Sequence, residues 1–360
     1  MRITFLLPTP GDTPIGGVKI IYEHANRLAA DGHAVTVVHT MTGQTRDRGL
    51  LFSIATFLGR RFGLRGGFSP KKWMHVNSNI NCIWAPTLSK HFIPTGDVIV
   101  ATAWTTAEAA IELPESYGIK YYFIQDYEFF MTAAAEIRER MAATYRGAFR
   151  NLVISPACRD MVIDCGGAVY AEVPNGLDLD HYKLTVPIDS PERKYIGFPA
   201  RSEPFKRTDD AITALTLYKE RNPNSDYKFW CFGGVQPQNL PSWIEFHLRP
   251  TDSELVELYN HTAIFIVPSQ YEGWGLPGSE AMCCGAALIS TDNGGVNAYA
   301  IHNRNALICQ TMEPKNILYF LEKIITTPNL RINLATEAHT HLQSFTWERA
   351  FFLFKAVLDI

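Results

Sequence analysis

The sequence predicts an α/β protein built from two Rossmann-like domains. Uninterrupted apolar runs, typical of strands buried in a parallel sheet, alternate along the chain with segments of helical length. The N-terminal stretch has a strand–helix–strand order with a glycine pair before the helix, which indicates a βαβ unit. A turn marked by Pro and Gly at 173–178 separates two such series. We therefore expect domains at 1–175 and 176–344.

Length and composition narrow the class of protein. The 360 residues are 46% apolar and 19% charged, which suits two globular domains. A net charge of −3, without interleaved aromatic and basic residues, argues against nucleic acid as a partner. The seven cysteines have no regular spacing, so no disulfide framework is expected. Adjacent Cys283 and Cys284 suit packing inside a helix better than metal binding.

Membrane insertion is not expected. The apolar run within Met1–Pro8 is too short for a signal peptide and indicates a first strand. No stretch approaches the ~20 apolar residues that span a bilayer. These observations predict a cytoplasmic protein.

In the first half, strands are expected at Ile3–Leu7 and Ala34–His39, with a helix between them from Gly17 to Asp31. The glycine pair at the helix entrance lacks the Gly-x-Gly-x-x-Gly spacing of the dinucleotide fingerprint, and no acidic residue closes the second strand. A tight turn that needs glycine for backbone reasons accounts for the pair. A nicotinamide-dependent oxidoreductase is therefore poorly supported.

Residues 43–72 depart from the α/β pattern. Basic residues prevail over a single acid, and the segment contains the apolar stretch Leu50–Leu58. A basic and apolar segment of this type suits a membrane interface. The alternative, a core helix with solvated arginines at its end, is slightly favoured by the sequence.

Later strands of the first half are expected at Asp97–Thr102, Tyr121–Ile124 and Asn151–Ser155, the last of which is expected to be the final strand of this half. Functional groups in parallel sheets collect at the carboxyl ends of strands. Asp126, which follows one of these strands with Gln125, is therefore a site candidate. A helix cap is an equally good explanation for it.

The second half opens with a strand at Tyr195–Phe198, and Arg201 and Lys206 lie five positions apart on the loop after it. An arginine fork and a lysine point charge at a strand end suit a diphosphate. Asp178 and Asp180 form an Asp-x-Asp pair, which we interpret as structural rather than as a metal clamp.

The most informative stretch is 263–295. A buried strand at Ala263–Val267 leads into a glycine-rich loop and a short helix, which Ser279 is expected to cap and Gly285 to end. Glu272 and Glu280 lie eight positions apart across this loop and helix start. Free N–H groups at such a loop suit phosphate, whereas carboxylates suit hydroxyls. The combination predicts a ligand with both, such as a nucleotide sugar.

This stretch closely resembles the signature of the retaining glycosyltransferases of family 4, which have the GT-B fold, with two Rossmann-like domains that face each other across a cleft. The resemblance covers nearly the whole chain and is strongest from 195 to 300. It implies donor-sugar contacts for Glu272 and ribose contacts for Glu280. The residues between them that match the signature are Gly273, Trp274, Gly275, Leu276 and Pro277.

The same resemblance assigns further residues. Arg201 and Lys206 would neutralise the leaving nucleoside diphosphate, although Ala200 replaces the usual glycine before the arginine. The loop at Gly17 would lie against the donor phosphates, which is the alternative to a purely structural turn. The family uses no obligatory metal or other cofactor, and its last helix, expected at 345–360, returns to the first domain, which binds the acceptor.

A weaker resemblance concerns the rhamnan-type rhamnosyltransferases, a subgroup that makes surface polysaccharides. It rests on Ala101-Thr-Ala-Trp104 and Gln125-Asp-Tyr-Glu128. Family members commonly have a His-Asp pair where this chain has Gln125 and Asp126. Gln125 replaces that histidine here, so the weight shifts to Asp126 as the catalytic candidate.

Together these observations predict a metal-independent, retaining glycosyltransferase. It would transfer a sugar from a nucleoside diphosphate donor to a hydroxyl of a glycan or lipid-linked acceptor. Residues 43–72 would be the contact if the enzyme works at the inner face of the membrane. Two rival functions are a catalytically inactive GT-B partner subunit and a nucleotide-sugar epimerase, which would act without an acceptor.

Overall fold

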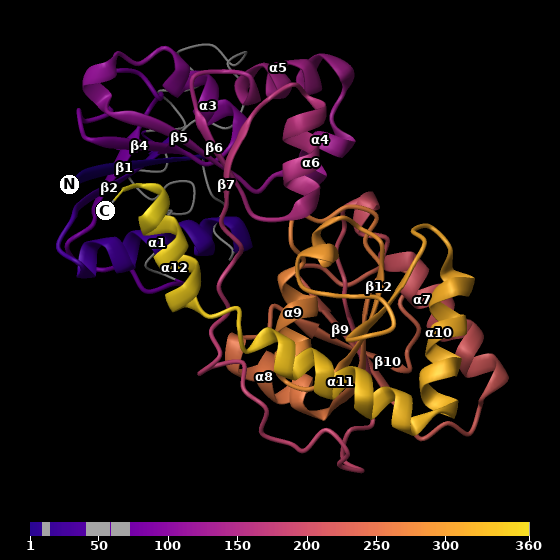
Figure 1. Cartoon of the computed structure of the whole chain (residues 1–360). Helices are drawn as coiled ribbons and strands as arrows, with labels where there is room; N and C mark the ends of the chain where they lie inside the picture. The colour runs from indigo at the N-terminus through magenta and orange to yellow at the C-terminus, as the bar shows by residue number, and fades with distance from the viewer. Residues whose placement is uncertain (9–14, 41–57, 59–72, 360) are drawn as a thin grey trace. The chain divides into compact units, whose positions relative to one another are not determined.

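The computed structural model describes residues 1–8, 15–40, 58 and 73–359. The chain divides into two compact units. Unit 1 comprises Met1–Ile154, Cys158–Pro174 and Ala350–Ile360, and unit 2 comprises Ser155–Ala157 and Asn175–Arg349. Each unit has a parallel sheet with helices on both faces, so the predicted α/β class with two Rossmann-like domains is confirmed (Figure 1).

The described part of unit 1 has a seven-stranded parallel sheet in the order β3-β2-β1-β4-β5-β6-β7. Its strands are β1 (Arg2–Leu7), β2 (Ala34–Thr40), β3 (Asn81–Ala85), β4 (Val98–Ala101), β5 (Ile119–Ile124), β6 (Arg150–Val153) and β7 (Val169–Glu172). Its helices include α1 (Gly16–Ala30), α3 (Trp104–Ile111), η2 (Glu115–Tyr117), α4 (Tyr127–Thr132), α5 (Ala135–Tyr145), α6 (Pro156–Asp164) and α12 (Trp347–Val357). Figure 1 shows α1 and α12 on one side of the sheet and α3 and α5 on the other.

The sheet of unit 2 has six parallel strands in the order β10-β9-β8-β11-β12-β13 within the described residues. They are β8 (Tyr195–Pro199), β9 (Lys228–Gly233), β10 (Ile244–Leu248), β11 (Thr262–Val267), β12 (Ala287–Thr291) and β13 (Ala306–Cys309). The helical elements are η3 (Pro204–Lys206), α7 (Thr208–Arg221), α8 (Asp252–His261), α9 (Leu276–Cys283), η4 (Gly295–Ala298), α10 (Pro314–Thr326) and α11 (Pro328–Leu342). Strand β11 is buried at every position, which explains its uninterrupted apolar sequence.

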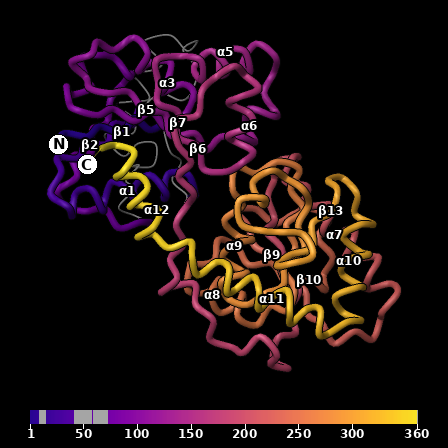
Figure 2. Tube along the Cα trace, viewed as in Figure 1, coloured from indigo at the N-terminus to yellow at the C-terminus, as the bar shows by residue number. Residues whose placement is uncertain are grey.

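The chain passes between the units near Pro174 and again near Ala350. At these passages the Leu177 N–H donates to the Phe345 carbonyl at 2.8 Å, and Figure 2 shows the two segments of the trace side by side. Beyond the second passage, α12 packs into unit 1. Its Phe354 is fully buried, with its ring centroid 4.4 Å from that of His24 on α1 and 6.2 Å from that of Phe5 on β1.

Two local expectations are wrong. Asn151–Ser155 is not the last strand of the first half, because β7 follows it at the sheet edge. Ser279 does not cap α9, since the helix begins three residues earlier, after Gly275, whose φ of 88° is in the left-handed region. Gly285, with a φ of 87°, does follow the end of that helix as expected.

Candidate functional site

The strand order of unit 2 indicates where a ligand binds. In an open parallel sheet, ligands occupy the crevice at the carboxyl ends of the two strands where the order reverses. Here that point lies between β8 and β11. The loop after β8 carries Arg201 and Lys206, and the loop after β11 carries Glu272. The topology therefore brings three of the predicted residues to one edge of the sheet.

Lys206 and Glu272 form an ion pair at this edge. Lys206 Nζ donates to Glu272 Oε2 at 2.8 Å, and the Ser269 hydroxyl donates to Glu272 Oε1 at 2.7 Å. The two charged side chains are only 15% and 14% exposed. Partial removal from water strengthens the attraction between them and fixes the carboxylate.

Arg201 is held through its backbone. Its N–H donates to Thr208 Oγ1 at 2.9 Å, and the same hydroxyl donates to the Arg201 carbonyl at 2.7 Å. The guanidinium lies over the Phe232 ring, 5.2 Å from its centroid. An arginine whose backbone and ring contacts are fixed offers its N–H groups in a preorganised direction.

Two glycines beside the loop, Gly278 in α9 and Gly295 after β12, are required by close packing. A Cβ on Gly278 would lie 2.7 Å from the Tyr299 hydroxyl, which itself donates to the Gly275 carbonyl. A Cβ on Gly295, after β12, would lie 2.6 Å from the backbone nitrogen of Trp274. These contacts fix the path of residues 272–276 against the neighbouring loop.

The structure places the remaining residues of the signature on this loop and at the start of α9. Gly273 lies on the loop, and Leu276 is the first residue of α9. Trp274 is only 3% exposed, its indole packing 5.5 Å from the Tyr299 ring and donating to Ser279 Oγ at 3.3 Å. Any ligand contact of Trp274 in this conformation would therefore use its backbone. The predicted donor-binding role of these residues stays a prediction.

Glu280 lies in α9, and its charge acts on three buried tyrosines of unit 2. Burial raises the pKa values of Tyr182, Tyr259 and Tyr299, and the charge of Glu280 adds to each rise. Sequence reasoning missed these tyrosines, because nothing local to them indicates a partner on a distant helix.

A buried arginine fixes the far end of α9. The Arg193 guanidinium donates to the carbonyls of Cys284 at 2.7 Å and Thr262 at 2.9 Å, and also to that of Val186. Burial lowers its pKa to about 10. The last carbonyls of a helix carry partial negative charge, so this cation satisfies the C-terminus of the helix that bears Glu280.

In unit 1, Gly17 lies in the first turn of α1 beside Gln125. The Gln125 amide donates to the Gly17 carbonyl at 3.3 Å. A Cβ on Gly17 would lie 3.5 Å from Gln125 Oε1, an ordinary contact distance, and its φ is outside the left-handed region. Backbone strain therefore does not explain this glycine. The contacts between Gly17 and Gln125 do not test the prediction that Gly17 lies against the donor phosphates.

Asp126 follows β5 and stands directly before α4. Its side chain makes no capping hydrogen bond to that helix, so the helix-cap explanation is wrong in its usual form. Oδ1 is buried and has no hydrogen-bond partner among the residues that the structure describes. Burial raises the pKa of Asp126 to about 6, and the backbone N–H groups of Asp126 and Trp104 partly offset this rise. Its catalytic role stays a prediction.

The Asp-x-Asp pair has a structural contact. Asp178 Oδ1 accepts a hydrogen bond from the His181 N–H at 3.0 Å, which closes a turn. Across the described ranges, no group of three or more His, Cys, Asp and Glu side chains is arranged to hold a metal ion. Metal independence remains a prediction about the reaction.

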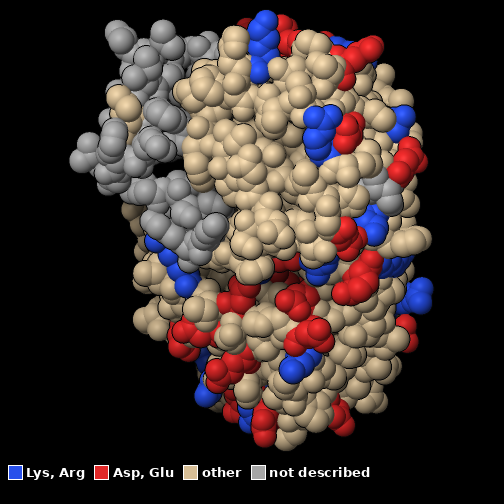
Figure 3. Space-filling model, turned by 90° about the vertical axis from the view of Figure 1, so that its left-hand side faces the viewer, with Lys and Arg blue, Asp and Glu red and all other residues tan. Residues whose placement is uncertain are grey.

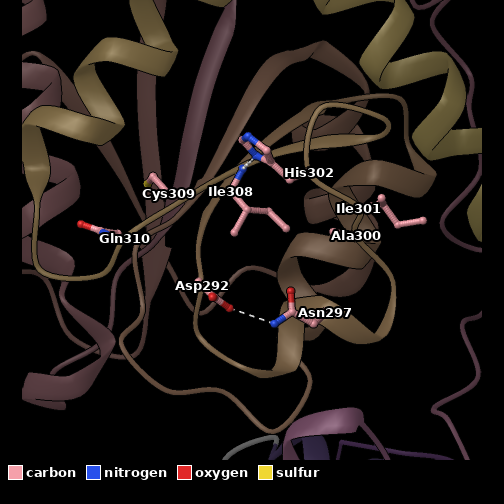
Figure 4. A pocket seen from close by; sticks show the side chains of 8 residues that line it. All are labelled: Asp292, Asn297, Ala300, Ile301, His302, Ile308, Cys309 and Gln310. Carbon is pink, nitrogen blue, oxygen red and sulfur yellow. Dashed lines mark hydrogen bonds between the residues drawn. The ribbon is translucent and has the colours of Figure 1, made fainter.

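A hollow of about 480 Å³ lies elsewhere on the same edge of unit 2 (Figure 4). It adjoins the ends of β12 and β13, and Asn297 donates to Asp292 Oδ1 across its wall at 2.8 Å. Its full lining is Asp292, Asn297, Ala300, Ile301, His302, Ile308, Cys309 and Gln310. None of the predicted site residues lines it, so we do not assign the donor to this hollow.

Three observations concern contact with a membrane. On the face drawn in Figure 3, Lys and Arg side chains are scattered singly, and no broad basic area is seen among the described atoms. No described helix combines the length and apolar character needed to cross a bilayer. The predicted basic segment 43–72, apart from Leu58, lies outside the described residues.

The sequence of unit 2 matches a known family of proteins over most of its length. Residues 187–341 match the family model for glycosyl transferases group 1. A D-inositol 3-phosphate glycosyltransferase of Paenarthrobacter aurescens is 24% identical over 285 residues, which cover 70% of each chain. The protein of the same name from Rhodococcus erythropolis is 24% identical over 48% of this chain and 42% of its own length.

Solved structures show the fold of the whole chain. Anabaena HepE in complex with UDP-glucose has a TM-score of 0.74 at 16% identity and covers 100% of this chain and 99% of its own. Sucrose-phosphate synthase from Thermosynechococcus elongatus has a TM-score of 0.73 at 16% identity, with 99% and 98% covered. The chain therefore has the GT-B fold, and the family match supports a group 1 glycosyltransferase.

Proposed function

We propose that this GT-B protein is a retaining glycosyltransferase of the family 4 type. It would transfer a sugar from a nucleoside diphosphate sugar to a hydroxyl of a glycan or lipid-linked acceptor without a metal ion. The observation that carries the proposal is the convergence of Arg201, Lys206 and Glu272 at the carboxyl ends of β8 and β11. HepE, which shares the fold, has been solved with UDP-glucose, and this supports a nucleotide sugar as the donor.

The cations of the site would act on the leaving group. As the bond between the sugar and the diphosphate breaks, negative charge grows on the phosphate oxygens. Arg201 and Lys206 would stabilise that charge in the transition state more than in the ground state, which is the requirement for catalysis. Because they supply positive charge directly, the proposed reaction has no need of a bound metal.

The carboxylates would act on the hydroxyl groups of the donor. Glu272, fixed by Lys206 and Ser269, would orient the sugar hydroxyls, and Glu280 would accept hydrogen bonds from the ribose. In the proposed retaining route the acceptor attacks from the side of the departing diphosphate, so no protein nucleophile takes part. The Gly273–Gly275 loop lets the backbone come close to the bound donor.

Unit 1 would bind the acceptor, with Gly17 and Asp126 nearest the reaction. The resemblance to rhamnan-type enzymes makes rhamnose the first donor sugar to test and surface polysaccharide synthesis the proposed role. We place this activity in the cytoplasm, at the inner face of the membrane if residues 43–72 bind lipid.

A donor screen tests the proposal. Purified protein is heated with rhamnose, glucose and N-acetylglucosamine donors linked to UDP, GDP, ADP and dTDP. A true donor should raise the melting temperature, because a ligand that binds only the folded state stabilises it. Transfer to an acceptor is then followed by NMR, and the anomeric configuration should be kept. Inversion would overturn the retaining assignment.

The same screen separates the rival functions. Product formation without any added acceptor would indicate an epimerase. Binding without transfer or donor hydrolysis under any condition would indicate an inactive partner subunit. Absence of stabilisation by every donor would contradict the nucleotide-sugar proposal itself.

A further inference from the structure

Arg207, which directly follows Lys206, has a left-handed backbone conformation. Its φ is 51° and its ψ is 36°. Glycine adopts this region readily, whereas a residue with a Cβ adopts it only at a cost in free energy. At Arg207 the chain turns from η3 into α7. The backbone immediately after Lys206 is therefore in a conformation that an arginine does not favour by itself.

Asp210, in the first turn of α7, holds Arg207 in place. Arg207 Nε donates to Asp210 Oδ2 at 2.9 Å and Nη2 donates to Asp210 Oδ1 at 2.7 Å, which is a bidentate ion pair. The Asp210 N–H also donates to the Arg207 carbonyl at 2.9 Å. Asp210 is 5% exposed, whereas the neighbouring Asp209 is exposed. Asp210 thus contacts Arg207 through both its side chain and its backbone.

Other contacts fix the rest of the loop between β8 and α7. The Thr208 hydroxyl bonds to both the N–H and the carbonyl of Arg201, which closes the loop from 201 to 208. The Gln270 N–H, on the loop after β11, donates to the Phe205 carbonyl at 2.7 Å. The residue before Lys206 is therefore held by a backbone hydrogen bond, and the residue after it is held by Asp210.

The backbone on both sides determines where the Lys206 ammonium lies. Its Nζ is 2.8 Å from Glu272 Oε2 and 5.2 Å from the centroid of the Phe205 ring. A lysine has a flexible stem and a point charge, without the rigid fork that orients an arginine. Its position therefore depends on the segment that carries it, and a change of φ at Arg207 would move Lys206 relative to α7.

We propose that Asp210, acting through Arg207, is a positioning residue that keeps Lys206 directed at the diphosphate of the donor. The ion pair holds the left-handed turn, and the turn places the lysine. This inference rests on the proposed function, because it takes Lys206 to bind a diphosphate. Arg207 has a structural role in this proposal, since Asp210 occupies two of its N–H groups.

Arg207→Ala and Arg207→Gly test the turn, because they remove the same charge and differ in backbone preference. Without the ion pair, alanine should leave the left-handed region and displace Lys206, whereas glycine should keep the turn. The probe is whichever of UDP, GDP and ADP binds the wild-type protein most tightly in isothermal titration. Its dissociation constant should rise about tenfold in Arg207→Ala, the loss of one hydrogen bond to a charged group, and less than threefold in Arg207→Gly.

Asp210→Asn tests the other half of the pair. It keeps the size of the side chain and removes its charge, so it should weaken binding of the same probe in the same direction as Arg207→Ala. Asp209→Asn is the matched control, since it removes the same charge from the same helical turn at an exposed position. It should change the dissociation constant less than twofold.

A Lys206→Met background separates positioning from general structural damage. If Arg207→Ala acts by displacing Lys206, it should weaken binding less than twofold further once the ammonium is gone. Partial unfolding would add its full effect in either background. Turnover at saturating donor should also fall at least tenfold in Arg207→Ala, because a displaced Lys206 no longer stabilises the departing diphosphate.

A second pair of variants keeps the test decisive if Arg207→Ala does not fold. In an Arg207→Gly background, Asp210 has no strained arginine to hold, so adding Asp210→Asn should weaken binding less than twofold. The same substitution alone should have the larger effect. Equal effects of Asp210→Asn in both backgrounds would overturn the role of Arg207 as the link.

A crystal structure of Asp210→Asn tests the turn without any ligand. Lys206 Nζ should no longer lie within hydrogen-bond distance of Glu272, and an unchanged contact would overturn the positioning role. Equal weakening of binding in Arg207→Ala and Arg207→Gly would overturn it too, because it would make the Arg207 charge itself a phosphate ligand.

The outcomes distinguish this inference from the proposed function. Weaker binding in Lys206→Met, with wild-type binding in Arg207→Ala and Asp210→Asn, would overturn the positioning role and leave Lys206 as a diphosphate ligand. If the wild-type protein binds none of the three nucleoside diphosphates, the proposed function fails. The crystal structure then still decides whether Asp210 places Lys206.

Discussion

Lys206 Nζ lies 2.8 Å from Glu272 Oε2, although 66 positions separate the two residues in the chain. Each residue follows a different strand of the sheet, β8 or β11, and the reversal of strand order makes these strands neighbours. The pair is mostly shielded from water, so each charge depends on the other. Neither residue is therefore expected to behave as an independent catalytic group.

Replacing either member of this pair alone should lower stability and turnover by more than half of the loss caused by replacing both. Lys206→Met leaves the largely buried Glu272 carboxylate without its cation, and we expect it to lower the free energy of unfolding by about 1–3 kcal/mol. Turnover should fall roughly 100- to 1,000-fold, the range for one lost transition-state donor. Denaturant unfolding and kinetics of Lys206→Met, Glu272→Gln and the double variant form the cycle. Strictly additive effects would show that the contact carries no energy.

The two glutamates should have separable effects on kinetics. Glu280→Gln is expected to raise the KM for the donor about tenfold with little change in kcat, because a ribose contact is the same in the ground and transition states. Glu272→Gln should lower kcat as well, since Glu272 orients the sugar that reacts. Equal, small effects in steady-state assays would remove both assignments.

Asp126 should make the protein less stable as pH rises. Its pKa is raised to about 6 by burial, so the folded state binds the proton more tightly than the unfolded state. The free energy of unfolding should then decrease between about pH 4 and pH 6 and level off above that, by roughly 2–3 kcal/mol at most. Asp126→Asn, compared with wild type in urea at pH 4, 5, 6 and 7, should lack this decrease.

Asp97→Asn is the control, because the pH dependence of stability that Asp97 contributes has the opposite sign to that of Asp126. Hydrogen bonds from the backbone and side chain of Arg2 lower the pKa of Asp97, so its contribution is present at neutral pH and is lost on acidification. If Asp126 also acts in catalysis, Asp126→Asn will lower turnover while raising stability at pH 7. Parallel pH curves for wild type and Asp126→Asn would contradict the buried-carboxyl interpretation.

Chelation should leave the activity unchanged. Arg201 and Lys206 supply the positive charge at the proposed diphosphate site, so dialysis against EDTA is expected to retain nearly full transfer activity. The assay is repeated with added manganese and magnesium. Activity lost in EDTA and restored by either ion would revive the Asp178–Asp180 alternative.

The basic segment allows a test with vesicles. If residues 43–72 bind lipid, apolar side chains such as Phe57 would enter the interface while the basic residues meet anionic headgroups. Each basic residue near such a surface contributes about 1 kcal/mol, less in salt. The protein should then sediment with phosphatidylserine vesicles at low salt, and less so at high salt or after reversal of Arg60 and Arg61 to Glu. No sedimentation at any salt would favour the core-helix alternative, in which replacing Phe57 lowers the melting temperature instead.

Local patterns in the sequence were enough to predict β1, β2, β4, β5, β6, β8 and β11, but not the edge strands β3 and β7. The apolar run at 263–267 and the alternation of strand and helix depend on neighbours along the chain, and β11 follows that run with only Thr262 added. The glycine-rich loop around Gly275 and the end of the helix at Gly285 could also be recognised from the local sequence. The start of α9 was nevertheless misjudged, because the left-handed φ of Gly275 is held by the Tyr299 hydroxyl 24 positions away.

Which side chains meet was decided by the tertiary structure. The spacing of Glu272 and Glu280 indicated a ligand with hydroxyl groups, but it held no information about their protein partners. Lys206 reaches Glu272 across 66 positions, and only the pairing of β8 with β11 brings their loops together. Periodicity and turn chemistry act over a few residues, whereas a hydrogen bond between distant segments exists only when the whole sheet and its helices are assembled.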